Sequence, residues 1–423
     1  MEFENSLQFA QELDRRDPLK DFRNQFIIPS EKGVEQIYFL GNSLGLQPKR
    51  TEAAIKEILH QWAQYGVEGF FKGDNPWLHY HDSLPKPLSK IVGALPQEIA
   101  VMNQLSVNLH LMLVSFYQPK GKRNKIICEA KAFPSDQYMF ETHIKHYGFN
   151  PDDTIIEVAP REGEHTIRTE DILAVIEKYK DETALVLFSG INYYTGQLFD
   201  IPGITKAAQQ AGAKVGFDLA HAAGNVSLHL HDWNADFACW CSYKYLNAGP
   251  GAVGAVFIHE RHHNDTSLKR FAGWWGYDTA TRFKMEKGFK PNPGADGWQL
   301  STPAFMLYSA HKASLEIFEE AGWEKIQAKK DLLNDWLWFL LSDVNNNAKN
   351  KTIEFITPQN KKERGCQVSM LMLQRGREIF NALAEAGIMA DWREPNVIRI
   401  APVPLYNTYE EIWRFANILS KLI

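Results

Sequence analysis

Asp218 and Lys244 each follow an apolar stretch, and their residue types and placement suit chemistry on a bound heterocycle. Residues 215–217 are apolar and end at Asp218, and the apolar run 237–241 leads to Lys244. A lysine after such a run is poorly solvated, which lowers the pKa of its amine and suits it to nucleophilic attack and proton transfer. A carboxylate that ends a neighbouring strand can keep a ring nitrogen protonated.

This pairing of an acid with a lysine is the layout that pyridoxal 5′-phosphate (PLP) requires. The lysine amine forms a Schiff base with the aldehyde, and the carboxylate keeps the pyridine nitrogen protonated so that the ring can take up electrons. Taken singly, Asp218 is typical of a strand-ending turn and Lys244 of a solvated surface lysine. The apolar run before the lysine, the hydroxyl groups beside it and the glycines of 249–251 after it favour the joint interpretation.

The composition is that of an ordinary globular protein and points to no polymeric partner. The 423 residues are 44% hydrophobic and 23% charged, with a formal net charge of −5. This charge favours neither nucleic acid nor an anionic membrane as a partner. No apolar run approaches the length of a membrane span, and residues 1–4 lack the basic-then-apolar pattern of a signal peptide. We therefore expect a cytoplasmic protein.

The cysteines and histidines predict neither disulfides nor a metal site. Four cysteines over this length do not form a disulfide framework. Cys239 and Cys241 alternate in an apolar run and are expected to be core residues. Several histidines are closely paired without a carboxylate or cysteine at a recognised ligand spacing, so we expect no metal. These pairs are His79 and His81, His229 and His231, and His262 and His263.

Apolar strands that alternate with helices predict the fold class. We expect strands at 125–128, 184–189, 214–218, 237–241 and 253–258, and helices at 5–16, 51–65, 169–178 and 202–211, with a further helix that opens at 102–106. Strands that are apolar throughout must be covered on both faces, so the pattern predicts an α/β fold with a mostly parallel sheet. Ligands on such sheets lie beyond the carboxyl ends of the strands, where Ser189, Asp218 and Lys244 fall.

The helix at 51–65 and the segment after it also give definite expectations. Thr51 is expected to cap this helix, Gly66 to end it, and Leu59 and Trp62 to lie on its apolar face. Thr169 is expected to cap the helix that follows it. The aromatic-rich residues 66–80 lack a clear period and predict a loop that packs against another part of the chain.

The pattern changes beyond residue 300, which predicts a second domain. Long helices at 303–320 and 323–342 and a polar turn at 345–347 precede a short α+β segment. That segment is expected to hold strands at 366–373 and 397–401, a helix at 376–386 and a final helix from about 408. We expect a large domain at 51–302, a small α+β domain at 303–423, and an N-terminal arm at 1–50 that joins the small domain.

With these stretches in view, the sequence resembles the kynureninase family, which are fold-type I PLP enzymes of the aminotransferase class V group. The resemblance covers nearly the whole chain, from the Phe-Leu-Gly-Asn-Ser-Leu-Gly stretch at 39–45 to the Arg-Ile-Ala-Pro-Val-Pro-Leu-Tyr-Asn stretch at 399–407. Between them, Phe-Pro-Ser-Asp at 133–136, Asp-Leu-Ala-His at 218–221 and Trp-Cys-Ser-Tyr-Lys at 240–244 match closely. An Asp with a distant Lys would indicate only a PLP enzyme, whereas this combination of stretches indicates the family more specifically.

The resemblance implies which residues of one chain contribute to the cofactor site. Lys244 would bond the cofactor and move protons, Asp218 would contact the pyridinium, and Phe133 would stack on the ring face. Leu105 and Ser106 would hold the phosphate at a helix start, together with Tyr243. The remaining cofactor residues that the resemblance implies are Pro134, Ser135, Asp136, Ser189 and His221.

The resemblance also implies a homodimer and a substrate site. Trp274 and Thr302 would reach the phosphate region of the neighbouring subunit, and Arg399 would bind the substrate carboxylate, unless it forms only a structural salt bridge. Ser106 and Thr302 depart from common family usage, which has threonine and often asparagine at these positions. Val67 stands where animal-type members carry histidine and, with Ser301 and Thr302, would set the choice between kynurenine and its 3-hydroxy form.

The implied reaction is hydrolysis of the Cβ–Cγ bond of L-kynurenine, or of 3-hydroxy-L-kynurenine, in tryptophan catabolism. The products are L-alanine and an anthranilate, and a general base near Tyr243 would help water add to the side-chain ketone. The nearest alternative is a cysteine desulfurase, which needs a mobile cysteine, and Cys366 is the candidate for that role. A non-catalytic α/β protein that binds a small molecule is the alternative from another class.

Overall fold

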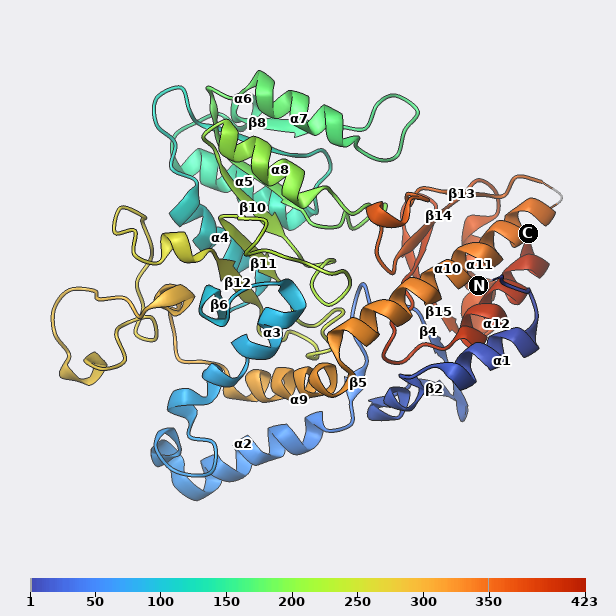
Figure 1. Cartoon of the computed structure of the whole chain (residues 1–423), viewed down its shortest axis with the longest axis horizontal. Helices are drawn as coiled ribbons and strands as arrows, with labels where there is room; N and C mark the ends of the chain where they lie inside the picture. Colours follow the sequence, from blue (N-terminus) through green and yellow to red (C-terminus); the bar gives the residue numbers. More distant parts are fainter. Residues whose placement is uncertain (1, 349) are drawn as a thin grey trace.

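A seven-stranded sheet forms the centre of the larger lobe of the molecule (Figure 1). The computed structural model describes residues 2–348 and 350–423. β12 is antiparallel to its two neighbours and the other pairs are parallel, which confirms the predicted mostly parallel α/β sheet. In sheet order the strands are β6 (Ile99–Val101), β12 (Ala255–Ile258), β11 (Phe237–Trp240), β10 (Lys214–Asp218), β9 (Thr183–Ser189), β7 (Lys125–Glu129) and β8 (Ile155–Val158).

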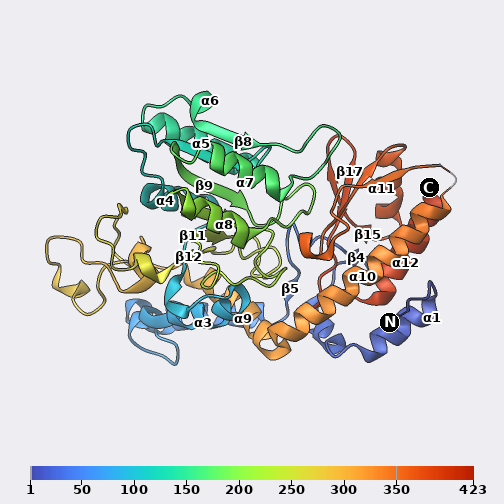
Figure 2. The ribbon, with the colours of Figure 1, turned by 45° about the horizontal axis from the view of Figure 1, so that its top comes forward.

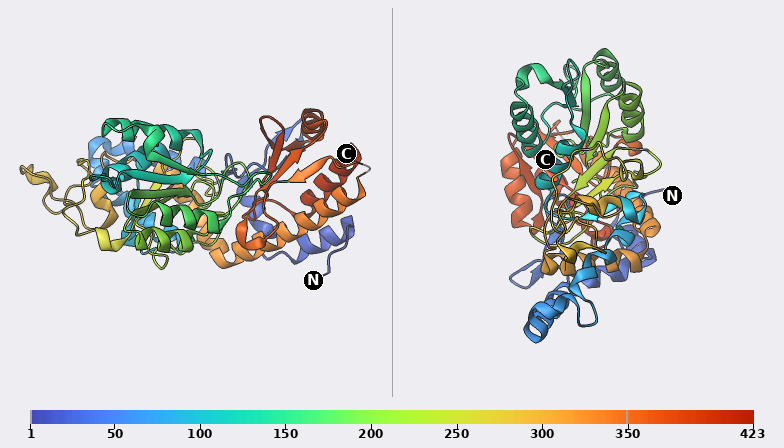
Figure 3. Two further views of the ribbon diagram at one scale, coloured as in Figure 1. Left: turned by 90° about the horizontal axis from the view of Figure 1, so that it is seen from above. Right: turned by 90° about the vertical axis from the view of Figure 1, so that its left-hand side faces the viewer.

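Helices cover both faces of this sheet because its strands are apolar on both sides. Ile126 and Leu185 pack in one buried cluster with α4 and α5, whereas their neighbours Ile127 and Val186 pack in another with α7 and α8. The end-on view in Figure 3 shows the sheet between these two pairs of helices. The helices are α4 (Leu105–Phe116), α5 (Pro134–His146), α7 (Thr169–Lys178) and α8 (Ile201–Gln210).

A four-stranded antiparallel sheet forms the smaller lobe, together with helices and the start of the chain. Its order is β13-β14-β17-β16. In the N-terminal arm, α1 packs against α12 and β4 pairs with β15, so both chain ends lie on this lobe (Figure 3). The elements are α1 (Leu7–Arg16), β4 (Ile37–Tyr38), β13 (Ile353–Phe355), β14 (Val368–Met372), α11 (Gly376–Glu385), β15 (Ile388–Met389), β16 (Asp391–Arg393), β17 (Val397–Ile400) and α12 (Tyr409–Leu422).

Two helices lead from the larger lobe to the smaller one. α9 (Phe305–Ala321) packs against α2 (Thr51–Tyr65), and α10 (Trp323–Asn347) then runs to the smaller sheet, as Figure 2 shows. We propose that residues 1–50 and 303–423 form the small domain and residues 51–302 the large one, with α9 packed on the large domain. Among the described residues, no helix is long and apolar enough to cross a membrane.

Several local predictions are wrong at helix ends. Thr51 and Thr169 are the first residues of their helices rather than caps, and the capping positions are held by Arg50 and Arg168 without a side-chain bond. The predicted polar turn at 345–347 is the last turn of α10, where Asn346 and Asn347 are exposed and polar residues are tolerated. α5, β13, β15 and β16 were not predicted, because each is short or lacks a clear apolar period.

The apolar face predicted for α2 is only partly buried in the chain. Ile58 is buried, but Leu59 and Trp62 are 42% and 59% exposed. The helix stands out from the body of the larger lobe (Figure 1). The segment predicted as a loop at 66–80 instead forms two short 3-10 helices, 66–70 and 77–83. Its aromatic residues Phe70 and Trp77 pack on Phe305, which confirms the predicted packing.

Candidate active site

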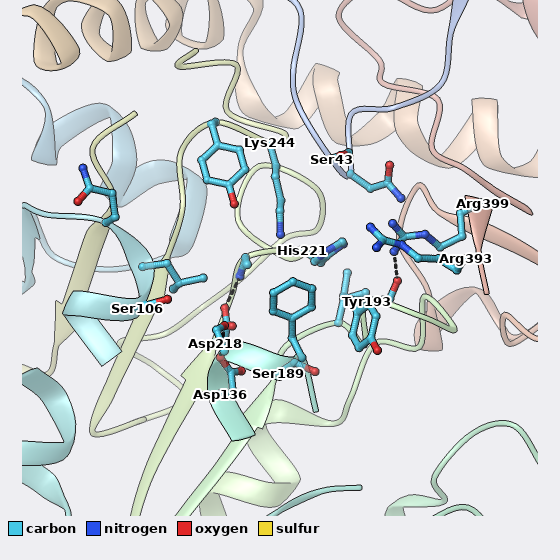
Figure 4. Close-up of a pocket in the computed structure, with 18 residues that line it drawn as sticks. Ser43, Ser106, Asp136, Ser189, Tyr193, Asp218, His221, Lys244, Arg393 and Arg399 are labelled. Atoms are coloured by element: carbon cyan, nitrogen blue, oxygen red, sulfur yellow. Dashed lines mark hydrogen bonds between the residues drawn. The ribbon is translucent and has the colours of Figure 1, made fainter. Parts of the chain in front are cut away.

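A cavity of about 300 Å³ lies at the carboxyl ends of β9 and β10 and beside the loop that follows β11. Parallel pairing places Asp218 directly opposite Ser189 on one side and Cys239 on the other. The lining side chains come from both lobes, as Figure 4 shows. They are Asn42, Ser43, Gln104, Leu105, Ser106, Phe133, Ser135, Asp136, Ser189, Ile191, Tyr193, Asp218, Ala220, His221, Tyr243, Lys244, Arg393 and Arg399.

Asp218 is a buried carboxylate at the floor of the cavity. Its Oδ1 accepts a hydrogen bond of 2.8 Å from the backbone N–H of Ala220, which fixes its orientation at the strand end. Burial raises the pKa of Asp218, while the Ala220 hydrogen bond and the charge of Lys244 oppose that rise. A positive group against Asp218 would therefore stabilise the ionised carboxylate.

Two further acids stand beside Asp218. Burial and the charge of Asp218 raise the pKa of Asp136 well above its usual range. Burial also raises the pKa of Glu129 to about 7, and this carboxylate accepts hydrogen bonds of 3.1 Å from the Ser189 N–H and another from the Ser189 hydroxyl. Three acids so close together cannot all ionise without a nearby cation, so the cavity floor is prepared for positive charge.

Lys244 projects into the cavity from the loop after β11, and no hydrogen bond joins it to the other residues drawn in Figure 4. The nearby imidazole of His221 is buried, and its Nδ1 has no hydrogen-bond partner among the described residues. Burial and the charges of Lys244, Arg399 and Arg393 lower the pKa of His221 well below its usual range, so the ring is neutral. Both groups are thus open to a ligand.

The start of α4 forms the opposite corner of the cavity and suits a phosphate. Leu105 and Ser106 are the first two residues of this 12-residue helix, and Gln104 before them provides no side-chain cap. The first N–H groups of a helix lack partners inside it and carry partial positive charge, so they bind anions. Tyr243 lines the same cavity, and burial raises the pKa of its hydroxyl, which stays protonated.

Phe133 offers an apolar wall to a flat ligand. Its ring is 43% exposed although it lines the cavity, and it meets Tyr193 edge-on at a centroid distance of 5.1 Å. A planar heteroaromatic ring that lay against Phe133 would bury this exposed surface. The cavity thus offers an acid for a ring nitrogen in Asp218, an amine for an aldehyde in Lys244, and N–H groups for a phosphate at the start of α4. These residues fit PLP.

Two arginines close the side of the cavity formed by the smaller lobe. Arg399 is 1% exposed; its Nε donates to Asp391 over 2.7 Å, a second nitrogen donates to the same carboxylate, and a third donates to the Tyr193 carbonyl. Arg393 lines the cavity beside it and donates from Nε to the same Asp391 oxygen over 3.1 Å. Burial lowers the pKa of Arg399, and the neighbouring Arg393 lowers it further.

Five residues predicted for the site do not line the cavity of this chain. Pro134 opens α5 next to Phe133 without reaching the cavity. Trp274 is 39% exposed, Val67 is 73% exposed, and Ser301 and Thr302 are also exposed. The roles assigned to the last four involve either the neighbouring subunit or the substrate pocket, and they remain predictions.

Sequence reasoning missed several residues of the cavity. Asn42 and Ser43 lie in the Gly-rich 39–45 stretch, whose pattern alone indicates only a strand-to-turn connection. Tyr193 follows β9 by four residues, and Arg393 precedes the predicted Arg399 by six. An Asp-x-Arg spacing at 391–393 on an edge strand was the available signal, because alternate residues of a strand face the same side.

Ligand atoms of Glu98, His231 and His259 lie within 4.8 Å of one another at the other end of the sheet. A carboxylate thus stands next to one of the histidines that were considered as pairs. The two imidazole rings are stacked at 5.0 Å and 14°, however, and Nδ1 of His259 already accepts from the Arg261 N–H. Parallel rings do not direct their lone pairs to one point, so the group is a hydrogen-bonded cluster rather than a tetrahedral ligand set.

The cysteine positions argue against the desulfurase alternative. All four cysteines are buried, and none lines the cavity among the described residues. Burial raises the pKa of Cys366, the candidate for that role, to about 12. A buried thiol that stays protonated is a poor nucleophile, so Cys366 is unsuited to attack on a substrate sulfur.

Comparison with known proteins agrees with the site. The kynureninase C-terminal domain family model matches residues 326–419. The chain is 55% identical to a kynureninase from Flavobacterium johnsoniae, over 100% of this chain and 99% of that one. It is 46% identical to a kynureninase from Nematostella vectensis, over 98% and 93% of the two chains.

Solved structures share the fold at low identity. A cysteine desulfurase from Thermococcus onnurineus superposes with a TM-score of 0.73 at 18% identity, over 98% of each chain. A C-DES variant with glycine linked covalently to its PLP cofactor gives a TM-score of 0.76 at 17% identity, over 94% and 98% of the two chains. These likenesses concern the fold, whereas the full-length identities above define the relationship: the chain belongs to the kynureninase family of PLP-dependent enzymes.

Proposed function

We propose that the cavity around Lys244 hydrolyses the Cβ–Cγ bond of L-kynurenine to L-alanine and anthranilate. The single observation that carries this proposal is the Lys244 amine near the buried Asp218 carboxylate, with no hydrogen-bond partner among the cavity residues drawn in Figure 4, in a chain that matches kynureninases over its whole length. PLP, when bound, supplies an electron sink that stabilises negative charge on the substrate carbons. The chain itself supplies binding, orientation and proton transfer.

Each part of the cavity has a separate task in this proposal. Lys244 would bond the cofactor's aldehyde carbon and then carry the proton removed from the substrate Cα. Asp218 would face the ring nitrogen and keep it protonated, since its carboxylate is buried and aimed by the Ala220 N–H. Phe133 would cover one ring face, and the first N–H groups of α4 would bind the phosphate.

The remaining cofactor residues would hold the ring and support its polar groups. Asp136 is one of the acids on the floor of the cavity, and Ser189 donates a hydrogen bond to another of them, Glu129. The neutral His221 would pack near the ring. Tyr243 keeps its proton near neutral pH, so it would donate a hydrogen bond to the phosphate or to the substrate ketone. A separate base near Tyr243 would take the proton of the water that adds to that ketone.

We also propose that two chains form a homodimer and complete each other's sites. Leu59, Trp62 and Val67 leave apolar side chains exposed on and after α2, and such a surface is better buried in an interface. Trp274 and Thr302 lie outside the cavity of their own chain, which leaves them free to act in a partner's cavity. The proposed contacts would close the cavity at its phosphate end and around the aromatic ring of the substrate.

Hybrid dimers test this shared site. Mixing Lys244→Ala protein with Trp274→Ala protein is expected to restore part of the lost activity, because one of the two cavities in a hybrid would have an intact lysine and an intact tryptophan. Subunit exchange is followed with differently tagged chains, and activity is measured in the isolated hybrid. Hybrids that form without recovering activity would mean that each cavity is built by one chain.

Competition between the two kynurenines tests the activity and the pocket together. Val67 lies outside the cavity of its own chain, and its role here depends on the proposed dimer. Its side chain offers no hydrogen bond, so a ring hydroxyl buried beside it would lose a water partner at a cost of about 1–3 kcal/mol. Thr302 could partly replace that partner, and an apolar pocket rejects an added hydroxyl by about a hundredfold at most. We expect a higher kcat/KM for L-kynurenine, by no more than that factor, and a shift toward 3-hydroxy-L-kynurenine in Val67→His.

Both substrates are supplied in one reaction with the PLP-loaded enzyme, and the two anthranilates are separated and quantified. Formation of neither product by a well-folded holoenzyme would refute the proposed activity. A wild-type preference for the hydroxylated substrate would leave the activity intact and refute the role of Val67.

A further inference from the structure

Asp391, Arg393 and Arg399 form one charged group at the substrate side of the cavity. β16 pairs with β17 so that Asp391 lies directly opposite Arg399. Arg393 is two residues after Asp391 on the same strand and therefore projects from the same face of the sheet. The register alone thus brings two guanidinium groups and one carboxylate to one place, and both arginines line the cavity.

The single carboxylate does not balance the two cations. One oxygen of Asp391 accepts the hydrogen bonds from both arginines, which leaves the group with a net charge of +1. Two cations that share one acid at the wall of a largely buried cavity repel each other. Burial is the main cause that lowers the pKa of Arg399, and the charge of Arg393 lowers this pKa further. A monoanionic ligand at this wall would remove the excess charge.

Most of the free donors at this wall belong to Arg393. A guanidinium has five N–H donors. Arg399 already uses its Nε and both terminal nitrogens, toward Asp391 and the Tyr193 carbonyl. Among the described residues Arg393 makes one hydrogen bond, from Nε to Asp391, so both of its terminal nitrogens remain free. A carboxylate binds best to such a free edge through two parallel hydrogen bonds.

The position of the pair decides which anion it would meet. In Figure 4 the two guanidinium groups lie together on one side of Lys244, near Ser43 and His221, whereas Ser106 at the start of α4 lies on the other side. The phosphate would occupy the Ser106 corner, as argued above. The arginines are therefore placed for the other anionic group that must enter, the carboxylate of an α-amino acid.

We propose that Arg393 is a second residue that binds the substrate carboxylate, and that Asp391 positions both arginines for it. This inference rests on the proposed function and deepens it. Arg399 offers only its two remaining N–H donors, in a nearly fixed position, because all three of its nitrogens already make hydrogen bonds. Arg393 is 38% exposed at its side chain and held only through Nε, so it can complete the grip when the substrate enters. The pair thus matches a ligand with one negative charge at this position.

Removing the Arg393 charge should weaken carboxylate binding and spare the chemical step. Arg393→Gln is expected to raise the KM for L-kynurenine about ten- to a hundredfold, the effect of losing hydrogen bonds to a charged group, with kcat within about threefold of wild type. Arg393→Lys keeps the charge without the planar edge, so its KM is expected to lie between those of wild type and Arg393→Gln. The matched control is Arg377→Gln. Arg377 is also ion-paired, to Glu394, and lies on the opposite face against Trp392.

Binding of L-alanine and of L-alaninamide gives a readout that a merely structural role would not change. Inhibition or spectral titration of the holoenzyme by L-alanine should weaken in Arg393→Gln by the same factor as KM. The binding of L-alaninamide, which lacks the carboxylate, should differ by less than about twofold between Arg393→Gln and wild type. The dissociation constant of PLP should stay at the wild-type value, because the phosphate binds at the other end of the cavity.

Each outcome bears on one claim. Equal L-alanine binding in Arg393→Gln and wild type, with normal KM, would overturn the inference, and so would equal weakening of alanine and alaninamide. A loss of PLP affinity would place Arg393 at the cofactor instead. If wild type bound L-alanine through Arg393 but did not hydrolyse kynurenine, the carboxylate site would stand and the proposed reaction would fail.

Discussion

Replacing Lys244 with alanine is expected to lower kcat for kynurenine hydrolysis by at least about 10⁴-fold. Proton transfer by a positioned side chain alone contributes about 10²–10⁴-fold, and this lysine would also bond the cofactor. No other lysine lines the cavity among the described residues, so no second amine can replace it. Anthranilate formation under single-turnover conditions measures the loss.

The Lys244→Ala protein should still fold and bind PLP. Asp218, the start of α4 and the Phe133 ring are unchanged, and the removed side chain is half-buried at a cavity wall rather than packed in the core. The absorbance of the bound cofactor should shift to that of a free aldehyde. Lys206→Ala on the exposed face of α8 is the matched control and should keep wild-type kinetics. Substantial turnover by Lys244→Ala would mean that another amine holds the cofactor.

Residues that lie on or just after a strand could be predicted from the sequence. Ser189, Asp218 and Lys244 follow apolar runs that are long enough to fix a parallel sheet, and the edge of such a sheet collects them. The structure brings all three to one cavity. Leu105 and Ser106 could be placed in the same way, because a helix start is visible in the sequence and its N–H groups have a known use.

Residues that come from the other lobe could not be predicted in this way. Asn42 and Arg393 are hundreds of residues apart, and their convergence depends on how the smaller sheet packs against the larger lobe. Arg399 was predicted through the family resemblance, but its partner Asp391 depends on a cross-strand register in β16, which the sequence did not reveal. Glu129 ends a strand like any buried residue, and its contact with Ser189 appears only when β7 and β9 are neighbours.

The predictions of helix caps and of a buried face on α2 failed for a different reason. Thr51 has the residue type of a cap, yet the helix starts at this residue and its hydroxyl is buried without a partner among the described residues. Leu59 and Trp62 have the spacing of a core-facing stripe. The same spacing also serves an interface with another chain, and amphipathic periodicity cannot distinguish the two.

Asp218→Asn is expected to lower kcat by about 10²–10³-fold, the loss found when one preorganised electrostatic group is removed from an active site. The amide has the shape of the carboxylate, and its oxygen can still accept the Ala220 N–H bond that fixes Asp218 now. The substitution therefore removes the charge that keeps the ring nitrogen protonated and leaves the geometry in place. Single-turnover kinetics with deuterium at the substrate Cα should show that proton removal has become the slow step.

The neighbouring acids make this second test discriminating. Asp136 and Glu129 lie close enough to Asp218 that its charge raises the pKa of each. Removing that charge should therefore lower both values, and one of these carboxylates would ionise more readily in the Asp218→Asn enzyme. If Asp218 is the ring partner, Asp218→Asn is slow while the exposed control Asp181→Asn is normal. Wild-type kinetics in Asp218→Asn, lost only when Asp136→Asn is added, would instead assign the ring nitrogen to Asp136.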